Sequence, residues 1–73
     1  MSATNLLKRL FFEKNIRSKD VAKALGKPEQ SFYNQLNRDT WKFKEVEDIA
    51  ARYGCEIVLQ DTKTGDIYKQ KSL

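Results

Sequence analysis

The sequence predicts a mostly α-helical fold: a small four-helix domain that ends in a C-terminal β-hairpin. Up to about residue 53, apolar residues recur at three- and four-residue spacing, which is typical of amphipathic helices. After Gly54 the pattern changes to a short β-branched, apolar run, which is typical of a strand. A chain of 73 residues is near the lower limit for folding without disulfides or metal. We therefore expect one domain over residues 1–73.

Composition narrows the class of protein. A hydrophobic fraction of 40% and a charged fraction of 33% are typical of a globular chain. With no histidine and only Cys55, an intramolecular disulfide is excluded and a structural zinc site is not expected, so we predict no cofactor. No apolar run approaches the roughly 20 residues of a membrane span, and the first residues lack the features of a signal peptide. We expect a cytoplasmic protein without membrane contact.

The first helix is expected over about residues 4–14. Ser2 and Thr4 are both candidates for its N-cap, because their hydroxyls can accept hydrogen bonds from the free amides of a first turn. Its apolar stripe consists of Leu6, Leu7, Leu10 and Phe11. This spacing predicts one buried helix face.

Two short helices are expected on either side of Gly26, over about residues 18–25 and 28–37. Ser18 is the expected N-cap of the first. Pro28 fits the start of the second, because its missing N–H is not needed there. Glycine adopts the left-handed conformation of such a turn cheaply, so this arrangement predicts a helix-turn-helix.

A fourth helix is expected over about residues 43–53, followed after Gly54 by a hairpin over about 55–69. Trp41 is expected to be a packing anchor rather than a stacking surface for a base, and Cys55 a small hydrophobe rather than a nucleophile. The predicted core consists of Leu6, Leu10, Phe11, Ile16, Val21, Leu25, Phe32, Leu36, Trp41, Val46 and Ile49.

The predicted helix over 28–37 has a polar face suited to reading DNA. Phe32 and Leu36 share one side, which leaves Gln30 and Asn34 together on the other. Either amide can pair bidentately with N6 and N7 of adenine in the major groove. The alternative is that both are merely exposed polar residues.

Three neighbours accompany this amide pair. Ser31 and Tyr33 flank the predicted base-reading face. Tyr33 fits a contact to a phosphate or thymine methyl, or half-buried packing against the first helix. Because phosphates would repel its carboxylate, Glu29 fits either a helix-dipole role or acceptance from cytosine N4. We favour the dipole role.

The charge is unevenly distributed. Residues 1–44 hold ten Lys or Arg and four Asp or Glu, a net charge of +6, whereas residues 45–73 hold four and six, a net charge of −2. The positive part coincides with the predicted helix-turn-helix, which favours a polyanionic partner. A solvated surface of mixed charge is the alternative.

These residues resemble the Cro/C1-type (XRE-like) helix-turn-helix family of phage and bacterial repressors. The resemblance covers about residues 4–60 and lies in Ser18, Val21-Ala22, Leu25-Gly26, Phe32, residues 37–41 and residues 47–57. It implies a lambda-repressor-like fold and sequence-specific DNA binding. Two departures are Lys27 and Gln35, which stand where the family usually has apolar residues, so the rotation of the recognition helix stays open.

Two further sets of site residues are predicted. The candidates for phosphate contacts bound the helix pair and are Ser18, Lys19, Lys27, Arg38, Lys42 and Lys44. An exposed two-stranded edge readily pairs with a symmetry mate, so the hairpin is the expected dimerisation element. Its candidate residues are Ile57, Val58, Leu59, Ile67 and Tyr68.

The leading hypothesis is a double-stranded-DNA-binding transcriptional regulator, a repressor of phage or mobile-element type, that acts as a homodimer. The alternative is a protein-interaction module of antitoxin or antirepressor type, which would use the hairpin and an acidic face formed by Glu45, Glu47 and Asp48. RNA binding is a third hypothesis. An enzyme with a small-molecule substrate is not expected, because the acids are scattered and histidine is absent.

Overall fold

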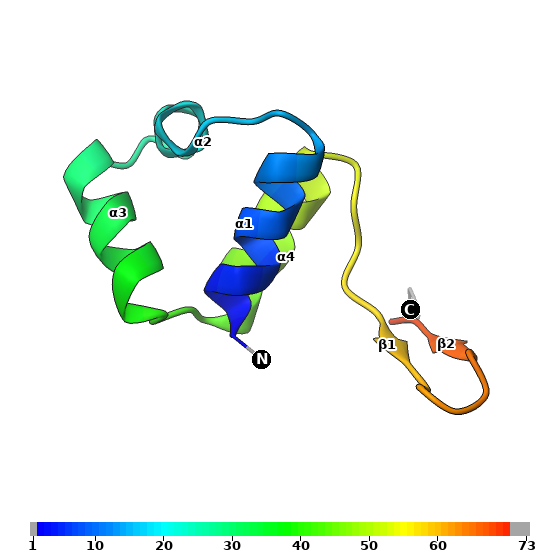
Figure 1. Ribbon diagram of the computed structural model, residues 1–73. Coiled ribbons are helices and arrows are strands. Elements are labelled where there is room, and N and C mark those ends of the chain that lie inside the picture. The colour runs from blue at the N-terminus through cyan, green and yellow to red at the C-terminus, as the bar shows by residue number, and fades with distance from the viewer. Residues whose placement is uncertain (1, 71–73) are drawn as a thin grey trace.

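The computed structural model describes residues 2–70; residues 1 and 71–73 of the predicted domain lie outside the described residues. The helices are α1 (Ala3–Glu13), α2 (Ser18–Ala24), α3 (Glu29–Arg38) and α4 (Phe43–Arg52), and the strands are β1 (Leu59–Gln60) and β2 (Ile67–Tyr68). α1 lies beside α4, α2 and α3 complete the helical body, and the hairpin extends away from it (Figure 1). The prediction of a mostly helical four-helix domain with a C-terminal hairpin is confirmed.

Each helix is followed by a residue in the left-handed conformation, and these residues are Asn15 (φ 55°), Gly26 (φ 69°), Asp39 (φ 54°) and Gly54 (φ 76°). After α2, the amide of Gly26 donates to the carbonyl of Lys23, and the amide of Lys27 donates to that of Ala22. This pair of bonds is the Schellman motif, which closes a helix end and reverses the chain. The predicted turn at Gly26 therefore has a defined structural basis.

The core lies where the four helices meet. Its largest fully buried side chains are Leu7, Val21, Phe32 and Ile49. Phe32 also contacts Trp41 edge to face, with ring centroids 6.0 Å apart and an interplanar angle of 76°. Trp41 packs against the core as predicted.

The predicted core position of Leu6 is wrong. Leu6 is 52% exposed, whereas Leu7 is 2% exposed and belongs to the core. Successive helix residues point about 100° apart, so both cannot lie at the centre of one face. The buried face of α1 is centred on Leu7 and Phe11, because these two and Thr4 are its buried residues.

Two predicted N-caps differ in the structure. Ser2 caps α1, since its hydroxyl accepts the amide of Asn5 at 3.0 Å, whereas Thr4 lies inside the helix. Ser18 is the first residue of α2 rather than its N-cap. Arg17 occupies the N-cap position without a side-chain capping bond.

The buried Thr4 hydroxyl connects α1 both to the last turn of α3 and to the segment that follows α3. Its Oγ1 donates to the carbonyl of Leu36 at 2.8 Å and accepts from Nε1 of Trp41 at 2.8 Å. The amide of Thr4 donates to Oδ1 of Asp39 at 2.9 Å. These three bonds fix the C-terminal end of α3 against α1.

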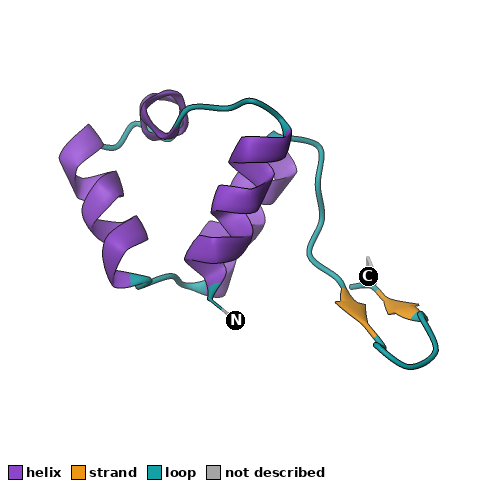
Figure 2. Cartoon of the chain, in the orientation of Figure 1, coloured by secondary structure: helices purple, strands orange, loops and turns teal. Residues whose placement is uncertain are grey.

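The hairpin is shorter than predicted. Leu59 pairs with Tyr68, and Gln60 pairs with Ile67, but residues 55–58 form no strand. Ile57 packs against the helical core instead, so this segment follows the helices before the chain turns outward. Figure 2 shows the strands separated from the helices by this connecting segment.

Candidate nucleic-acid interface

The outer face of α3 carries the predicted amide pair. Phe32 and Leu36 are 0% and 4% exposed and define the inner side of the helix. Successive helix residues are about 100° apart, so Asn34 points directly away from this inner side. Gln30 lies next to Asn34 on the outer face. Nε2 of Gln30 donates to Oδ1 of Asn34 at 3.1 Å, so the structure brings the two amides together on the surface.

Tyr33 and Glu29 form a second pair along one edge of α3. Tyr33 is 36% exposed, and its hydroxyl donates to Oε1 of Glu29 at 3.1 Å. The same bond and the nearby negative charge raise the pKa of Tyr33. The hydroxyl of Tyr33 therefore lies at the surface, bonded to its own helix, while much of the ring is covered. Ser31 is also exposed, on the opposite edge of the outer face.

One residue of this face was missed in the sequence. Asn37 is exposed and follows Asn34 by three positions and Gln30 by seven, so all three lie along one side of α3. The spacing of 30, 34 and 37 was the available signal. Asn37 is the last residue of the helix predicted over 28–37, where the chain was expected to leave the helix, whereas α3 extends to Arg38.

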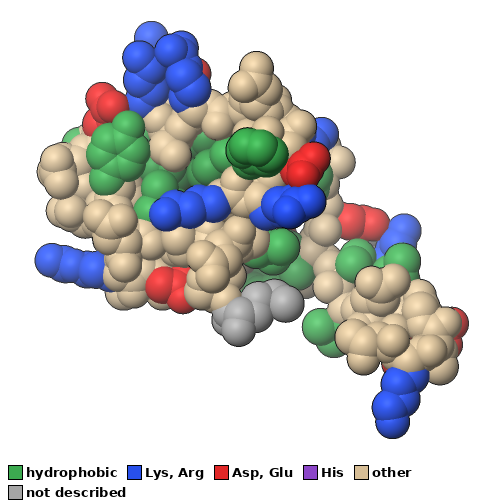
Figure 3. All heavy atoms as spheres, viewed as in Figure 1, with side chains coloured by type: hydrophobic (Ala, Val, Ile, Leu, Met, Phe, Trp, Pro, Cys, Tyr) green, Lys and Arg blue, Asp and Glu red, His purple; other side chains and the backbone are tan. Residues whose placement is uncertain are grey.

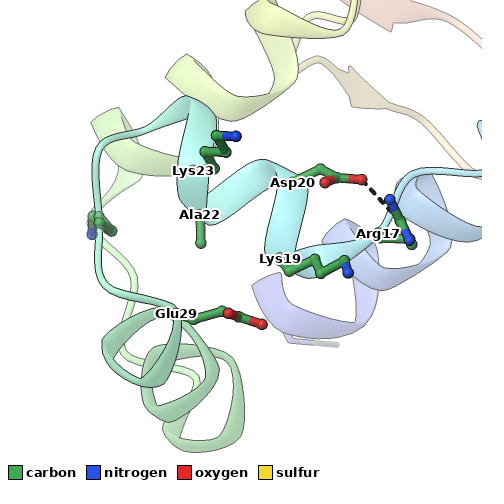
Figure 4. Close-up of a pocket in the computed structure, with 7 residues that line it drawn as sticks. Arg17, Lys19, Asp20, Ala22, Lys23 and Glu29 are labelled. Carbon is green, nitrogen blue, oxygen red and sulfur yellow. Dashed lines mark hydrogen bonds and ion pairs between the residues drawn. The ribbon is translucent and has the colours of Figure 1, made fainter.

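Basic side chains gather at the N-terminal end of α3. A hollow of about 450 Å³ between α2 and the start of α3 is lined by Arg17, Lys19, Asp20, Ala22, Lys23, Lys27 and Glu29. Figure 4 shows Lys19 on α2 and Glu29 on α3 facing this hollow. The guanidinium of Arg17 pairs with Asp20 at 3.0 Å. Arg17 and Lys23 therefore lie beside the predicted Lys19, and the fold adds Lys27 to the same hollow.

A second basic group lies at the other end of α3. Arg38 is in the last turn of the helix, and Lys42 and Lys44 stand at the start of α4. Nζ of Lys44 pairs with Asp48 at 3.1 Å, which raises the pKa of Lys44. The residues predicted to contact phosphates therefore fall into two groups, one at each end of α3.

Lys27 has protein partners as well as a place beside the hollow. Its Nζ lies 2.9 Å from Oε1 of Gln35 and 3.2 Å from Oε2 of Glu45. Nε2 of Gln35 donates to the same Glu45 oxygen at 3.0 Å, which closes a triangle of polar contacts. The two departures from the family pattern, Lys27 and Gln35, are thus in contact with each other.

Glu45 does not lie on the outer face of α4, where the sequence had placed it. Its other oxygen accepts the backbone amide of Lys42 at 2.9 Å. This amide, with Gln35 and Lys27, lowers the pKa of Glu45 to about 2. The Glu45 carboxylate is therefore charged throughout the neutral range.

The basic side chains project from several parts of the helical body, including the α2 edge (Figure 3). No group of His, Cys, Asp or Glu within residues 2–70 is arranged to hold a metal ion. None of the described helices has the length and apolar character needed to cross a membrane.

Comparisons of the chain with protein-family models, with curated proteins and with solved structures found no match.

Proposed function

We propose that this protein is a sequence-specific, double-stranded-DNA-binding transcriptional regulator and that α3 is its recognition helix. The observation that supports this most is the exposed amide pair of Gln30 and Asn34 between two basic groups. A short helix with amides outward and cations at both ends suits the major groove, where bases lie between two phosphate backbones.

The contact between the two amides suggests how bases are read. Asn34 accepts one hydrogen bond from Gln30 through Oδ1. It keeps a second lone pair on that oxygen and the two donors of its amide nitrogen. Asn34 can thus pair with N6 and N7 of adenine while Gln30 holds its amide plane. Ser31, Tyr33 and Asn37 extend the same surface.

Affinity for any duplex would come from the basic groups. In this proposal the phosphate contacts are made by Ser18, Lys19, Lys27, Arg38, Lys42 and Lys44, together with Arg17 and Lys23. Each lysine or arginine that neutralises a phosphate releases a counterion, so binding weakens as salt rises.

The experiment begins with selection of bound duplexes from a random library, followed by affinity measurements on the selected sequence. A Gln30→Ala, Asn34→Ala double variant should bind the selected duplex roughly 10- to 100-fold more weakly, because base-edge contacts are lost. Its affinity for scrambled DNA should not change. Asn5→Ala removes an exposed amide from α1 and is the matched control. Equal binding by the double variant and the wild type would contradict the assignment of this face.

Salt dependence separates this function from a protein-interaction module. DNA binding through several phosphates predicts a steep linear fall of log K with log salt. A flat response without a DNA complex would favour a protein partner. The structure provides less support for that alternative than the sequence did, because Glu45 contacts Lys27 and Gln35, and Asp48 pairs with Lys44.

We also propose that the protein acts in the cytoplasm as a homodimer joined through the hairpin. Leu59, Ile67 and Tyr68 are 74%, 53% and 58% exposed, which leaves their apolar surface available to a second copy. Ile57 packs against its own core and Val58 is half-buried, so these two contribute less to such an interface. A two-fold dimer would present two α3 helices to two half-sites.

A further inference from the structure

The end of α2 differs from the end of α1 in one chemical respect. In a Schellman motif, the second residue after the helix commonly makes an apolar contact with the helix. After α1 this residue is Ile16, whose amide donates to the carbonyl of Phe11 and whose side chain packs against the core. After α2 the equivalent residue is Lys27, which makes the same backbone bond to Ala22.

The side chain of Lys27 replaces the apolar contact with a polar one. Its ammonium group reaches Gln35 on α3 and Glu45 on α4, and Gln35 also reaches Glu45. The Lys27 and Glu45 side chains are 35% and 32% exposed, whereas the other ion pairs of the described residues have exposures of 51% to 77%. This cluster is therefore the best shielded of the ion pairs in the described part of the chain.

The cluster of Lys27, Gln35 and Glu45 contacts α3 at its flank, where a bond can restrict rotation of the helix about its axis. Gln35 lies about 100° around the helix from Asn34, between the outer face and the buried face. Apolar contacts permit a helix to roll by small angles, whereas hydrogen bonds with fixed donors and acceptors restrict it. Glu45 is itself held by the Lys42 amide at the start of α4. The restraint on Gln35 is thus anchored outside the helix-turn-helix.

We propose that Glu45 is a positioning residue that, through Lys27 and Gln35, fixes the rotation of α3 and so determines which side chains meet the bases. The inference rests on the proposed DNA-binding function. It assigns Lys27 a specificity role in addition to any contact with a phosphate.

The test uses the full chain and two readouts. Backbone residual dipolar couplings report the orientation of α3 relative to α1 and α4 without DNA. The ratio of affinities for selected and scrambled duplexes reports discrimination. In Glu45→Gln and Lys27→Met, the residual dipolar couplings of α3 should change. Those of α1 and α4 should still fit the relative orientation that these two helices have in the wild type. The discrimination ratio should fall about tenfold, since charge-assisted bonds are lost.

Matched variants separate positioning from other roles. Asp48→Asn makes the same acid-to-amide change on α4 at an exposed pair and should leave both readouts unchanged. Lys27→Arg keeps a cation that can reach both partners and should restore discrimination. A Lys27→Met, Gln35→Met double variant fills the space with apolar atoms and keeps the inference testable if Glu45→Gln does not fold.

The possible failures are distinguishable. If the wild type binds no duplex, the proposed function fails, but the couplings still show whether Glu45 sets the orientation of α3. Unchanged α3 couplings in the folded variants would overturn the positioning role. An equal loss of affinity for selected and scrambled DNA in Lys27→Met, with a smaller salt slope, would also overturn it and leave Lys27 as a phosphate contact.

Discussion

At the scale of single residues, a hydroxyl group decides how α3 is held. Thr4 is 6% exposed and satisfies both the carbonyl of Leu36 and the indole N–H of Trp41. No buried side-chain polar atom among the described residues lacks a partner. The sequence could predict that Trp41 packs in the core, but not this bond, because the partners are 37 positions apart. The sequence could not predict the contacts among Lys27, Gln35 and Glu45 either, because these residues are 8 to 18 positions apart.

Thr4→Val tests the contribution of this hydroxyl. Valine preserves the shape of threonine but leaves a buried carbonyl and an indole N–H without their partner, so we expect a loss of about 2 kcal/mol of unfolding free energy. Urea denaturation followed by the fluorescence of Trp41 measures it. Thr62→Val, at an exposed position in the hairpin turn, is the control and should have little effect. Equal stability of Thr4→Val and the wild type would show that water replaces both bonds.

At the scale of elements, helix positions were predictable because their signals are local. Each observed helix begins and ends within one or two residues of its predicted bounds, and Gly26 and Gly54 stand at the two predicted stops. The hairpin predicted over about 55–69 is present, but its predicted start was wrong, because β1 begins only at Leu59. A β-branched apolar run can form a strand or a connector that packs on helices, and only the position of the core distinguishes them. Ile57 lies in a connector and packs against the helical core.

The α2–α3 turn gives a prediction at this scale. A Cβ added at Gly26 meets nothing within 4 Å, so Gly26→Ala should be penalised only for its left-handed backbone. We expect a loss of about 1 kcal/mol in unfolding free energy with α2 and α3 retained, measured by chemical denaturation and circular dichroism. Gly65→Ala has the same backbone constraint and open space in the hairpin and should leave the helical body unaffected. Loss of the α2 and α3 structure in Gly26→Ala would refute this account.

At the scale of the whole molecule, the chain separates a positive helical body from a hairpin that exposes Leu59, Ile67 and Tyr68. Leu59 and Tyr68 are opposite each other in the register, so they share one face of the hairpin. Phe43, Leu59 and Tyr68 line the same hollow of about 310 Å³, so Phe43 lies beside that face. Phe43 is itself 55% exposed. Together these side chains form an apolar surface larger than the hairpin alone provides.

This surface predicts the oligomeric state. The wild type should sediment as a dimer at tens of micromolar, whereas a Leu59→Ser, Tyr68→Ser double variant should sediment as a folded monomer, because apolar burial between copies is lost. Lys63→Ser changes the hairpin turn outside this face and should remain dimeric. A monomeric wild type under these conditions would remove the hairpin dimer from the proposal for the free protein.

The bonds from Thr4 also have a consequence for the order in which the protein folds. They join residues 32 to 37 positions apart, so a long loop must close before they can form. The turn between α2 and α3 needs only neighbouring residues and can form early. The proposed recognition helix should thus exist before its orientation is set, and hydrogen exchange in its last turn should accelerate whenever the start of α1 opens.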